Sequence, residues 1–325
     1  MKYNSAELFV LALAFTFVLP AQATRPQSMR VETEERTTPM SASSPQAVQD
    51  QVILANQEFY KQIARKYDDY EACASDAFFQ RWIEDDLKIV ERKLPKRGDA
   101  VRCLDCGGGT GNVTLKMLRR GWRVTVVDVS ADMLAILERK VRSAGSSATF
   151  LNESVESFFS HSEETFDLIS FSSVLHHLYS PLNTIKTAAE KISPQGFFYS
   201  IFDPVPPSSQ FAAGCFTALD TFIAKLLHDR ADFLPGLARR VRKLGAPRDV
   251  THGRAVVSAG DLAEYHARQG IDDAAIESAL IHAGFAVDRR RYPVGRTAPM
   301  RHANRHLRLL LNFKILAQRT NQSSR

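Results

Sequence analysis

Short apolar runs alternate with amphipathic stretches through the middle of the chain. Five of these runs have the length of buried strands, and they span residues 101–104, 124–127, 149–151, 166–171 and 197–202. Between them, apolar residues recur at helical spacing, as Met133, Leu137 and Val141 do. Strands that alternate with helices in this way predict βαβ units, in which a mostly parallel sheet carries helices on both faces.

The pattern changes on either side of this region, which occupies residues 96–203. Upstream, helical periodicity begins near Val48 and predicts a helical flank or lid over residues 51–95. Downstream, the alternation stops, prolines break the chain, and a stripe of apolar residues predicts a helical insertion over residues 204–270.

The alternation returns in residues 271–325. Asp272 is a predicted N-cap, and the helix that follows it ends at Gly284. Two further apolar runs predict strands near residues 285–292 and 309–317. The complete pattern therefore predicts an α/β fold with a seven-stranded, mostly parallel sheet.

The N-terminus carries a different signal. Lys2 precedes an apolar run over residues 8–19, which is followed by Ala21-Gln22-Ala23, so residues 1–23 are typical of a secretory signal with an A-x-A cleavage site. The run is shorter than the roughly 20 residues that a spanning helix needs. The alternatives are an uncleaved apolar leader that contacts a membrane, or a start codon assigned too early. Residues 24–50 are rich in Ser, Thr, Pro, Gln and Glu and predict a flexible linker.

Composition excludes several classes of protein. The chain has 325 residues, of which 44% are hydrophobic and 24% charged, so it is neither a fully disordered chain nor a multi-span membrane protein. Its four cysteines are too few and too irregularly spaced for a disulfide framework. Cys103 and Cys106 form a C-x-x-C pair, but no second pair completes a zinc site, so we expect them to pack and assign no metal ligands.

The net charge of +6 is unevenly distributed. Residues 286–325 carry a net charge of +9, and the rest of the chain carries −3. Seven arginines lie close together there, at positions 289, 290, 291, 296, 301, 305 and 308. They predict either a solvated basic edge or a rim that attracts an anionic acceptor, such as a carboxylate, a phosphate or an acidic carrier protein.

A glycine-rich loop follows the first predicted strand. The sequence from Asp105 to Gly111 reads Asp-Cys-Gly-Gly-Gly-Thr-Gly, and Asn112 replaces the last glycine of a G-x-G-x-x-G dinucleotide fingerprint. The D-x-G-x-G-x-G spacing resembles motif I of the class I S-adenosylmethionine-dependent methyltransferases. Asp128 ends the second predicted strand, where a carboxylate can accept both ribose hydroxyls of an adenosyl group.

The resemblance extends over residues 101–203. The segment from Phe166 to Leu178 is similar to the F-D-…-L-H-H segment of small-molecule members, and the segment from Ile192 to Gly196 is similar to their L-x-P-G-G turn, with Gln195 in place of the first glycine. The resemblance implies a Rossmann-like fold, a substrate cover formed by residues 204–270, and S-adenosylmethionine as the cofactor. The cofactor-binding residues that it implies are Asp105, Gly107, Gly109, Gly111, Asp128, Met133, Glu153, Ser172 and Tyr67.

Three of these implied roles are specific. Met133 would pack on the adenine, although a helix-core role is an equal alternative. Glu153 stands where the family has Asp, which bonds the adenine amino group. Tyr67, with Asp68, resembles an upstream tyrosine that approaches the methionine end of the cofactor in some relatives.

A sulfonium already makes its methyl carbon electrophilic, so the protein mainly has to align the acceptor and exclude water. His176 and His177 follow the fourth predicted strand and are the candidate general bases, with a role in shaping the site as the alternative. His252, His266 and Asp203 are weaker candidates.

We expect methyl transfer to a small-molecule acceptor, most plausibly at oxygen. The alternatives are a macromolecular acceptor, namely RNA, protein or a carrier-bound acyl chain, or a non-catalytic cofactor-binding scaffold. A nucleic-acid acceptor is disfavoured because Ser172-Ser173-Val174-Leu175 occupies the position of the N/D-P-P-Y segment of amino-directed DNA methyltransferases. The cofactor is made in the cytosol, which favours a cytoplasmic location; residues 1–23 offer secretory or organellar targeting as the alternative.

Overall fold

The computed structural model describes residues 44–70, 76–96, 98–206, 266, 269–295, 298–307 and 309–320. The leader, residues 1–23, and nearly all of the insertion, residues 204–270, lie outside this part of the chain. So does His252. Among the described residues, no helix has the length and the apolar composition that crossing a membrane requires.

Seven strands form a single sheet in the order β3-β2-β1-β4-β5-β7-β6. The strands are β1 (Arg102–Cys106), β2 (Arg123–Val127), β3 (Thr149–Leu151), β4 (Phe166–Ser172), β5 (Ile192–Pro204), β6 (Phe285–Tyr292) and β7 (Asn312–Arg319). Strand β7 is antiparallel to both of its neighbours, and β1 to β5 pair in parallel. The predicted seven-stranded, mostly parallel sheet is therefore confirmed.

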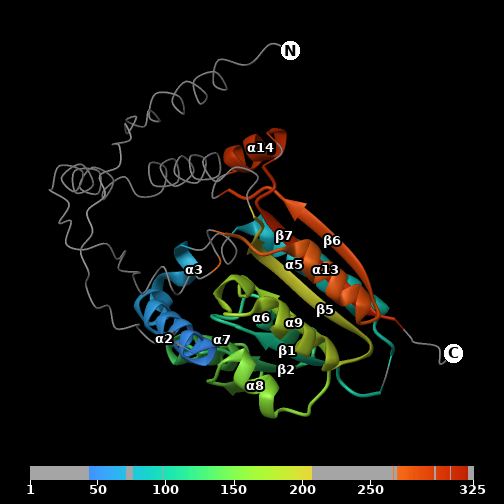
Figure 1. Cartoon of the computed structure of the whole chain (residues 1–325). Helices are drawn as coiled ribbons and strands as arrows, with labels where there is room; N and C mark the ends of the chain where they lie inside the picture. The colour runs from blue at the N-terminus through green and yellow to red at the C-terminus, as the bar shows by residue number, and fades with distance from the viewer. Residues whose placement is uncertain are drawn as a thin grey trace, which may run out of the picture. The chain divides into compact units, whose positions relative to one another are not determined.

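Helices cover both faces of the sheet, as predicted (Figure 1). Helices α8 (Val155–His161), α9 (Pro181–Glu190) and α13 (Asp273–His282) pack on one face, and α5 (Ala77–Lys93), α6 (Thr114–Leu118) and α7 (Ala131–Ser143) pack on the other. Because strand side chains alternate, Leu168 of β4 joins one core and Ile169 joins the other.

The remaining elements lie before β1, between β4 and α9, and between β6 and β7. They are α2 (Pro45–Ile63), the 3₁₀ turn η1 (Ala64–Lys66), α3 (Tyr67–Tyr70), the 3₁₀ turn η2 (Leu175–His177) and α14 (Ala298–His306). Side chains cap several helices where the sequence places Ser or Asp. Ser130 accepts from Met133 N at the start of α7, and Asp272, the predicted N-cap, accepts from Ala274 N at the start of α13.

A buried ion pair attaches α5 to the sheet. Lys314 Nζ of β7 lies 2.5 Å from Asp86 Oδ1 of α5, and Tyr199 of β5 donates its hydroxyl to Asp86 Oδ2 at 3.1 Å. Both charged side chains are about 95% buried, and burial raises the pKa of Asp86. A buried pair of this kind needs both partners, because removing either one leaves an uncompensated charge.

Several predicted boundaries are wrong. Helix α2 begins at Pro45, inside the predicted linker 24–50, because the first turn of a helix tolerates proline. Strand β5 begins at Ile192 rather than at residue 197. Gln195 has φ +65, so it takes the left-handed conformation that the first glycine of the family's turn would provide, and the strand continues through it.

Two helices were missed, and the last strand was placed too early. Helix α8 has seven residues, too few to show helical periodicity, and α14 is rich in charged and polar residues. Strand β7 runs over residues 312–319, whereas the prediction was 309–317.

Candidate functional site

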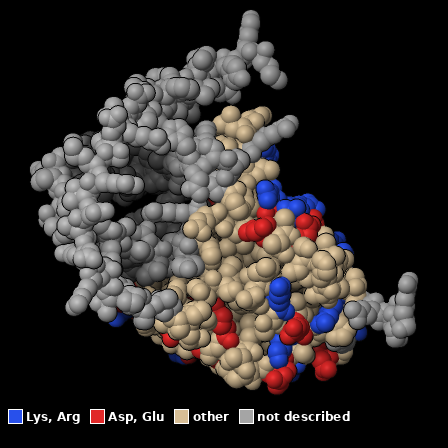
Figure 2. All heavy atoms as spheres, viewed as in Figure 1, with Lys and Arg blue, Asp and Glu red and all other residues tan. Residues whose placement is uncertain are grey.

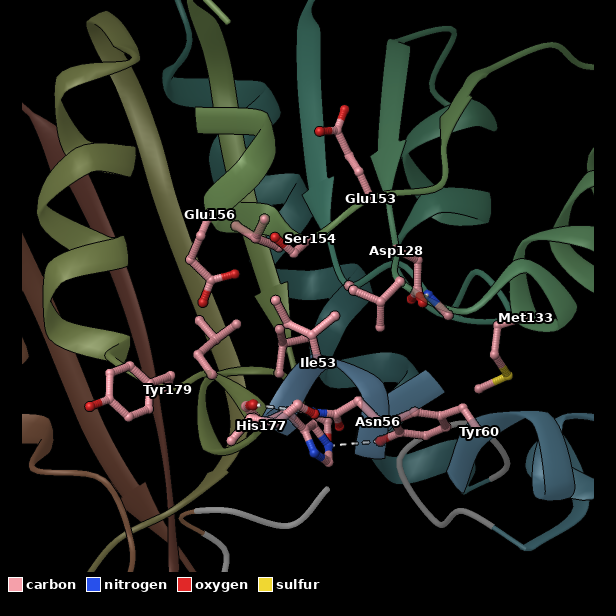
Figure 3. A pocket seen from close by; sticks show the side chains of 18 of the residues that line it. Ile53, Asn56, Tyr60, Asp128, Met133, Glu153, Ser154, Glu156, His177 and Tyr179 are labelled. Atoms are coloured by element: carbon pink, nitrogen blue, oxygen red, sulfur yellow. Dashed lines mark hydrogen bonds between the residues drawn. The ribbon is translucent and has the colours of Figure 1, made fainter. Parts of the chain in front are cut away.

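A pocket that is open to solvent lies at the carboxyl ends of the parallel strands. Loop residues that follow β1, β2 and β3 line it, and so does Ser172 at the end of β4. Helix α2 contributes a further part of the lining (Figure 3). Open α/β sheets bind ligands at this edge.

The glycine loop approaches the pocket through backbone alone. Gly107 has φ +65, and its N–H donates to Val127 O at 2.7 Å. A Cβ at this position would lie 2.5 Å from Val174 Cγ2, so only glycine fits. Gly107 and Gly109 both line the pocket. Gly111 does not, and a Cβ there would lie 2.2 Å from Leu137 Cδ1, so this glycine allows the loop to pack on α7.

Asp105 lies in the core below the glycine loop, where its side chain bonds to the neighbouring elements. It is 1% exposed and is not among the residues that line the pocket. Its Oδ2 accepts from Thr114 Oγ1 at 2.6 Å and from Thr114 N at 3.1 Å, and its Oδ1 accepts from Ser170 Oγ at 2.7 Å. Burial raises the pKa of Asp105. Both carboxylate oxygens hold α6 and β4 against β1, so Asp105 supports the loop, and its direct contact with the cofactor stays a prediction.

Asp128 lines the pocket and is anchored by two backbone amides. Gly109 N donates to Asp128 Oδ2 and Ser130 N donates to Asp128 Oδ1, each at 2.8 Å. Burial raises the pKa of Asp128 to about 6. An ionised carboxylate offers about four lone-pair sites. Each oxygen therefore keeps acceptor capacity toward the pocket, as an adenosyl ribose would need.

The other predicted cofactor residues also meet at this pocket. Tyr67, Met133, Glu153 and Ser172 all line it, and Figure 3 shows Met133 and Glu153 on the side of Asp128. Glu153 Oε2 accepts from Ser157 Oγ at 2.7 Å, and its other oxygen lies 3.6 Å from His161 Nε2. The tertiary structure thus brings together residues that are separated by more than 100 positions in the chain.

The two adjacent histidines point to different partners. His177 lines the pocket, and its Nε2 lies 2.7 Å from the hydroxyl of Tyr60. His176 does not line the pocket: its Nδ1 lies 2.7 Å from Asp203 Oδ1, which also accepts from His176 N at 3.2 Å. His176 and Asp203 are both buried and bind each other, and a base role for either of them stays a prediction. His266 donates its backbone N–H to His176 O at 2.9 Å and also lies outside the pocket lining.

Several polar residues of the pocket were not predicted from the sequence. Asn56 and Tyr60 come from α2, Glu156 from α8, and Tyr179 follows η2. Burial raises the pKa of Glu156. The available signal was helical spacing, since Asn56 and Tyr60 are four residues apart and lie on one face of α2. That face was interpreted only as apolar.

Four of the described C-terminal arginines are paired with carboxylates within the fold. Asp273 of α13 binds Arg289 and Arg291, and Glu277 also binds Arg289. Figure 2 shows basic and acidic side chains side by side where α13 and β6 lie.

Two more of these arginines have acidic partners. Arg290 binds Asp288 through two hydrogen bonds, and Arg301 lies 2.8 Å from Asp76. Arg305 is exposed, whereas Arg296 and Arg308 are outside the described residues. The steering of an anionic acceptor stays a prediction, and it now depends on fewer charges.

Cys103 and Cys106 are free and fully buried in β1. Burial raises the pKa of both thiols well above the ordinary value, which keeps them protonated. Their role is packing, as expected.

Comparison with known proteins gives a family and a fold. The family model described as "Methyltransferase domain" matches residues 76–275. A ubiquinone biosynthesis O-methyltransferase of Nitrosospira multiformis is 25% identical over 162 residues, which are 49% of this chain and 67% of that protein. The tRNA 5-carboxymethoxyuridine methyltransferase of Escherichia coli K12 is 31% identical over 116 residues, which are 35% of this chain and 44% of that protein.

Among solved structures, the plantazolicin methyltransferase BamL, in complex with a triazolic desmethylPZN analog and SAH, superposes with a TM-score of 0.52. The identity is 14%, and the match covers 85% of this chain and 98% of that one, so this likeness shows the fold. The chain matches 67% of the length of the first of these relatives and 44% of the length of the second. The family match, in contrast, covers more than half of the chain itself. The chain belongs to the methyltransferase domain family, as its resemblance to the class I S-adenosylmethionine-dependent enzymes implies.

Proposed function

We propose that the protein transfers a methyl group from S-adenosylmethionine to a small-molecule acceptor, at oxygen. The observation that supports this most directly is the pocket at the strand ends, where Gly107, Gly109 and Asp128 meet. The residues present fit an adenosyl group. Backbone without a Cβ allows close approach, and a buried carboxylate with free acceptor capacity suits two ribose hydroxyls.

When bound, the sulfonium supplies an electrophilic methyl carbon, so the chain's own task is to orient the acceptor and exclude water. An acceptor hydroxyl that keeps its proton needs a base within hydrogen-bond reach. Among the described residues that line the pocket, His177 is the histidine, and its Nε2 is hydrogen-bonded to the Tyr60 hydroxyl. We assign the proton of the acceptor hydroxyl to His177, which would take it directly or through the Tyr60 hydroxyl.

The acceptor class rests on the lining of the pocket. Apolar side chains, among them Val52, Ile53 and Leu178, line it between the polar groups, as is typical of small-molecule sites. The relatives include enzymes named for ubiquinone biosynthesis and for tRNA modification. A macromolecular acceptor is therefore the second candidate.

Isothermal titration of the full chain with S-adenosylhomocysteine tests the cofactor assignment. We expect the wild type to bind and Asp128→Ala and Gly107→Arg to bind far more weakly. Gly145→Arg is the matched control, because Gly145 also has φ +65 but has no atom within 4 Å of a Cβ position. Absence of binding to the wild type, or unchanged binding in the two pocket variants, would contradict the proposal.

Methyl-labelled S-adenosylmethionine, incubated with the protein and a cell extract, then separates the acceptor classes. Label in the solvent-extractable fraction supports a small molecule, and label in the precipitable fraction supports a macromolecule. Cofactor binding without transfer to any extract supports a non-catalytic scaffold.

A further inference from the structure

One buried polar atom of the pocket has no partner among the described residues. Asn56 of α2 is 5% exposed, and its Nδ2 donates to Val52 O at 2.9 Å and to His177 O at 3.3 Å. Two carbonyl acceptors on the nitrogen side determine which way the amide is turned. Its Oδ1 is left buried and without a hydrogen bond.

Such atoms are rare, because a buried polar group without a partner is costly. The described residues contain two other buried side-chain atoms of this kind, Arg120 Nε and Asn304 Oδ1. Neither of those residues lines the pocket, whereas Asn56 does and lies beside His177 and Tyr60 (Figure 3). A bound ligand could therefore supply the hydrogen-bond donor that Asn56 Oδ1 lacks.

The chemistry of that partner is constrained. An amide oxygen only accepts, so the ligand must present an N–H or O–H group to it. The described lining also contains three carboxylates, those of Asp128, Glu153 and Glu156, and it contains no Lys or Arg. This lining suits a ligand that is positively charged and rich in hydrogen-bond donors. S-adenosylmethionine has an amino group on its adenine, two ribose hydroxyls, an ammonium and a sulfonium.

We propose that Asn56 Oδ1 accepts a hydrogen bond from a donor of the bound cofactor, so that α2 forms part of the cofactor site. This inference rests on the proposed function. It adds a binding residue that lies 49 positions before Asp105, outside the glycine motif. Asn56 also donates to His177 O, so a cofactor that binds Asn56 would help to hold His177, the candidate base, in place.

Two substitutions at Asn56 separate this role from a purely structural one. Asn56→Leu removes both the oxygen and the nitrogen, whereas Asn56→Asp keeps an oxygen and loses the donor to His177 O. We expect S-adenosylhomocysteine to bind Asn56→Leu about tenfold more weakly than the wild type, since one hydrogen bond is lost and a ligand donor is left unpaired. Asn56→Asp should retain distinctly more affinity than Asn56→Leu.

Asn304→Leu is the matched control. Asn304 is also buried, its Nδ2 donates to Val294 O, its Oδ1 has no partner, and it lies on α14 outside the pocket lining. We expect this variant to bind S-adenosylhomocysteine like the wild type. Hydrogen exchange gives a second readout: S-adenosylhomocysteine should protect α2 in the wild type and protect it less in Asn56→Leu.

The inference is overturned if Asn56→Leu binds S-adenosylhomocysteine as tightly as the wild type, or if the Leu and Asp variants are weakened equally. Either result leaves the proposed function intact, because the wild type still binds. Failure of the wild type to bind would instead contradict the proposed function itself. Thermal unfolding of each variant shows whether it is folded. If Asn56→Leu does not fold, the affinity of Asn56→Asp for S-adenosylhomocysteine still tests the inference.

Discussion

The pocket has two walls that are held in different ways. The strand wall, formed by Gly107, Gly109, Asp128 and Ser172, lies at the ends of paired strands, and its loops are anchored by backbone hydrogen bonds such as that from Gly107 N to Val127 O. The helix wall, formed by Asn56 and Tyr60 of α2, is attached through side chains, because both residues bind His177.

The difference shows which wall is built into the fold. The strand wall cannot move without breaking the parallel sheet, which carries the two hydrophobic cores. The helix wall is joined to His177 by side-chain contacts, and α3, which follows it in the chain, is held by Lys140 Nζ, which binds Asp68 Oδ2 and Thr110 O. Segments that are held through side chains open at lower free energy than core strands. We therefore expect the strand wall to set the stability of the site and the helix wall to set its closure.

The largest effect is expected from a side chain added to the strand wall. Gly107→Ala places a Cβ 2.5 Å from Val174 Cγ2 at φ +65 and should lower the free energy of unfolding by about 2–4 kcal/mol, from overpacking and backbone strain together. Gly109→Ala, whose Cβ meets Met133 Cε at 3.8 Å, should cost only the strain, about 1–2 kcal/mol. Urea unfolding measures both.

Gly145→Ala serves as the control for that series, because it has the same φ and open space around the Cβ position. If Gly107→Ala were no less stable than Gly145→Ala, the close packing of the strand wall around Gly107 would not contribute to stability as we expect. Gly107→Ala combined with Val174→Ala should recover the overpacking part of the loss.

A smaller effect is expected from protonating Asp128. Its pKa is raised to about 6, so the carboxylate that accepts ribose hydroxyls is mostly ionised at pH 7 and mostly protonated at pH 5. If the ionised form is the one that binds, the dissociation constant of S-adenosylhomocysteine should rise about tenfold from pH 7 to pH 5. Titration calorimetry across this range measures it. Asp128→Asn should bind weakly with no such dependence, and a wild-type affinity that is constant over the range would refute the role of Asp128.

The smallest effect on stability is expected at the helix wall. Lys140→Met removes the bonds to Asp68 and Thr110 O, and because both charged side chains are partly exposed, the cost should be about 0.5–1 kcal/mol. Hydrogen exchange should show faster opening of residues 45–70 and unchanged protection of β1 and β4. Equal loss of protection in those strands would mean that the two walls unfold together.

Much of the strand wall was predictable from local pattern. Apolar runs mark the strands, and Gly107, Gly109 and Asp128 follow two of them directly, at the edge where parallel strands end. The direction of Asp105 was not predictable. It also ends a strand, but side chains of a strand alternate in direction, and only its contacts with Thr114 and Ser170 show that it points away from the pocket.

The histidine pair shows the same limit. Nothing in the dipeptide distinguishes His176 from His177, and the 3₁₀ turn η2 directs one toward Asp203 and the other toward Tyr60. The partners lie 27 and 117 positions away in the chain. Contacts over such separations follow from the packing of whole elements, which local spacing does not encode.

The sequence by itself determined the succession of the seven strands and of most helices between them, the glycine loop with its acidic partner, and hence the family. These features depend on short-range chemistry: side-chain periodicity, the conformational freedom of glycine and the length of buried runs. Only the tertiary structure decided that α2 forms a wall of the pocket and that Asp105 and His176 face inward to buried partners. It also decided that four of the described C-terminal arginines pair with carboxylates such as Asp273 and Glu277. The physical reason is that burial and pairing arise when distant segments pack together.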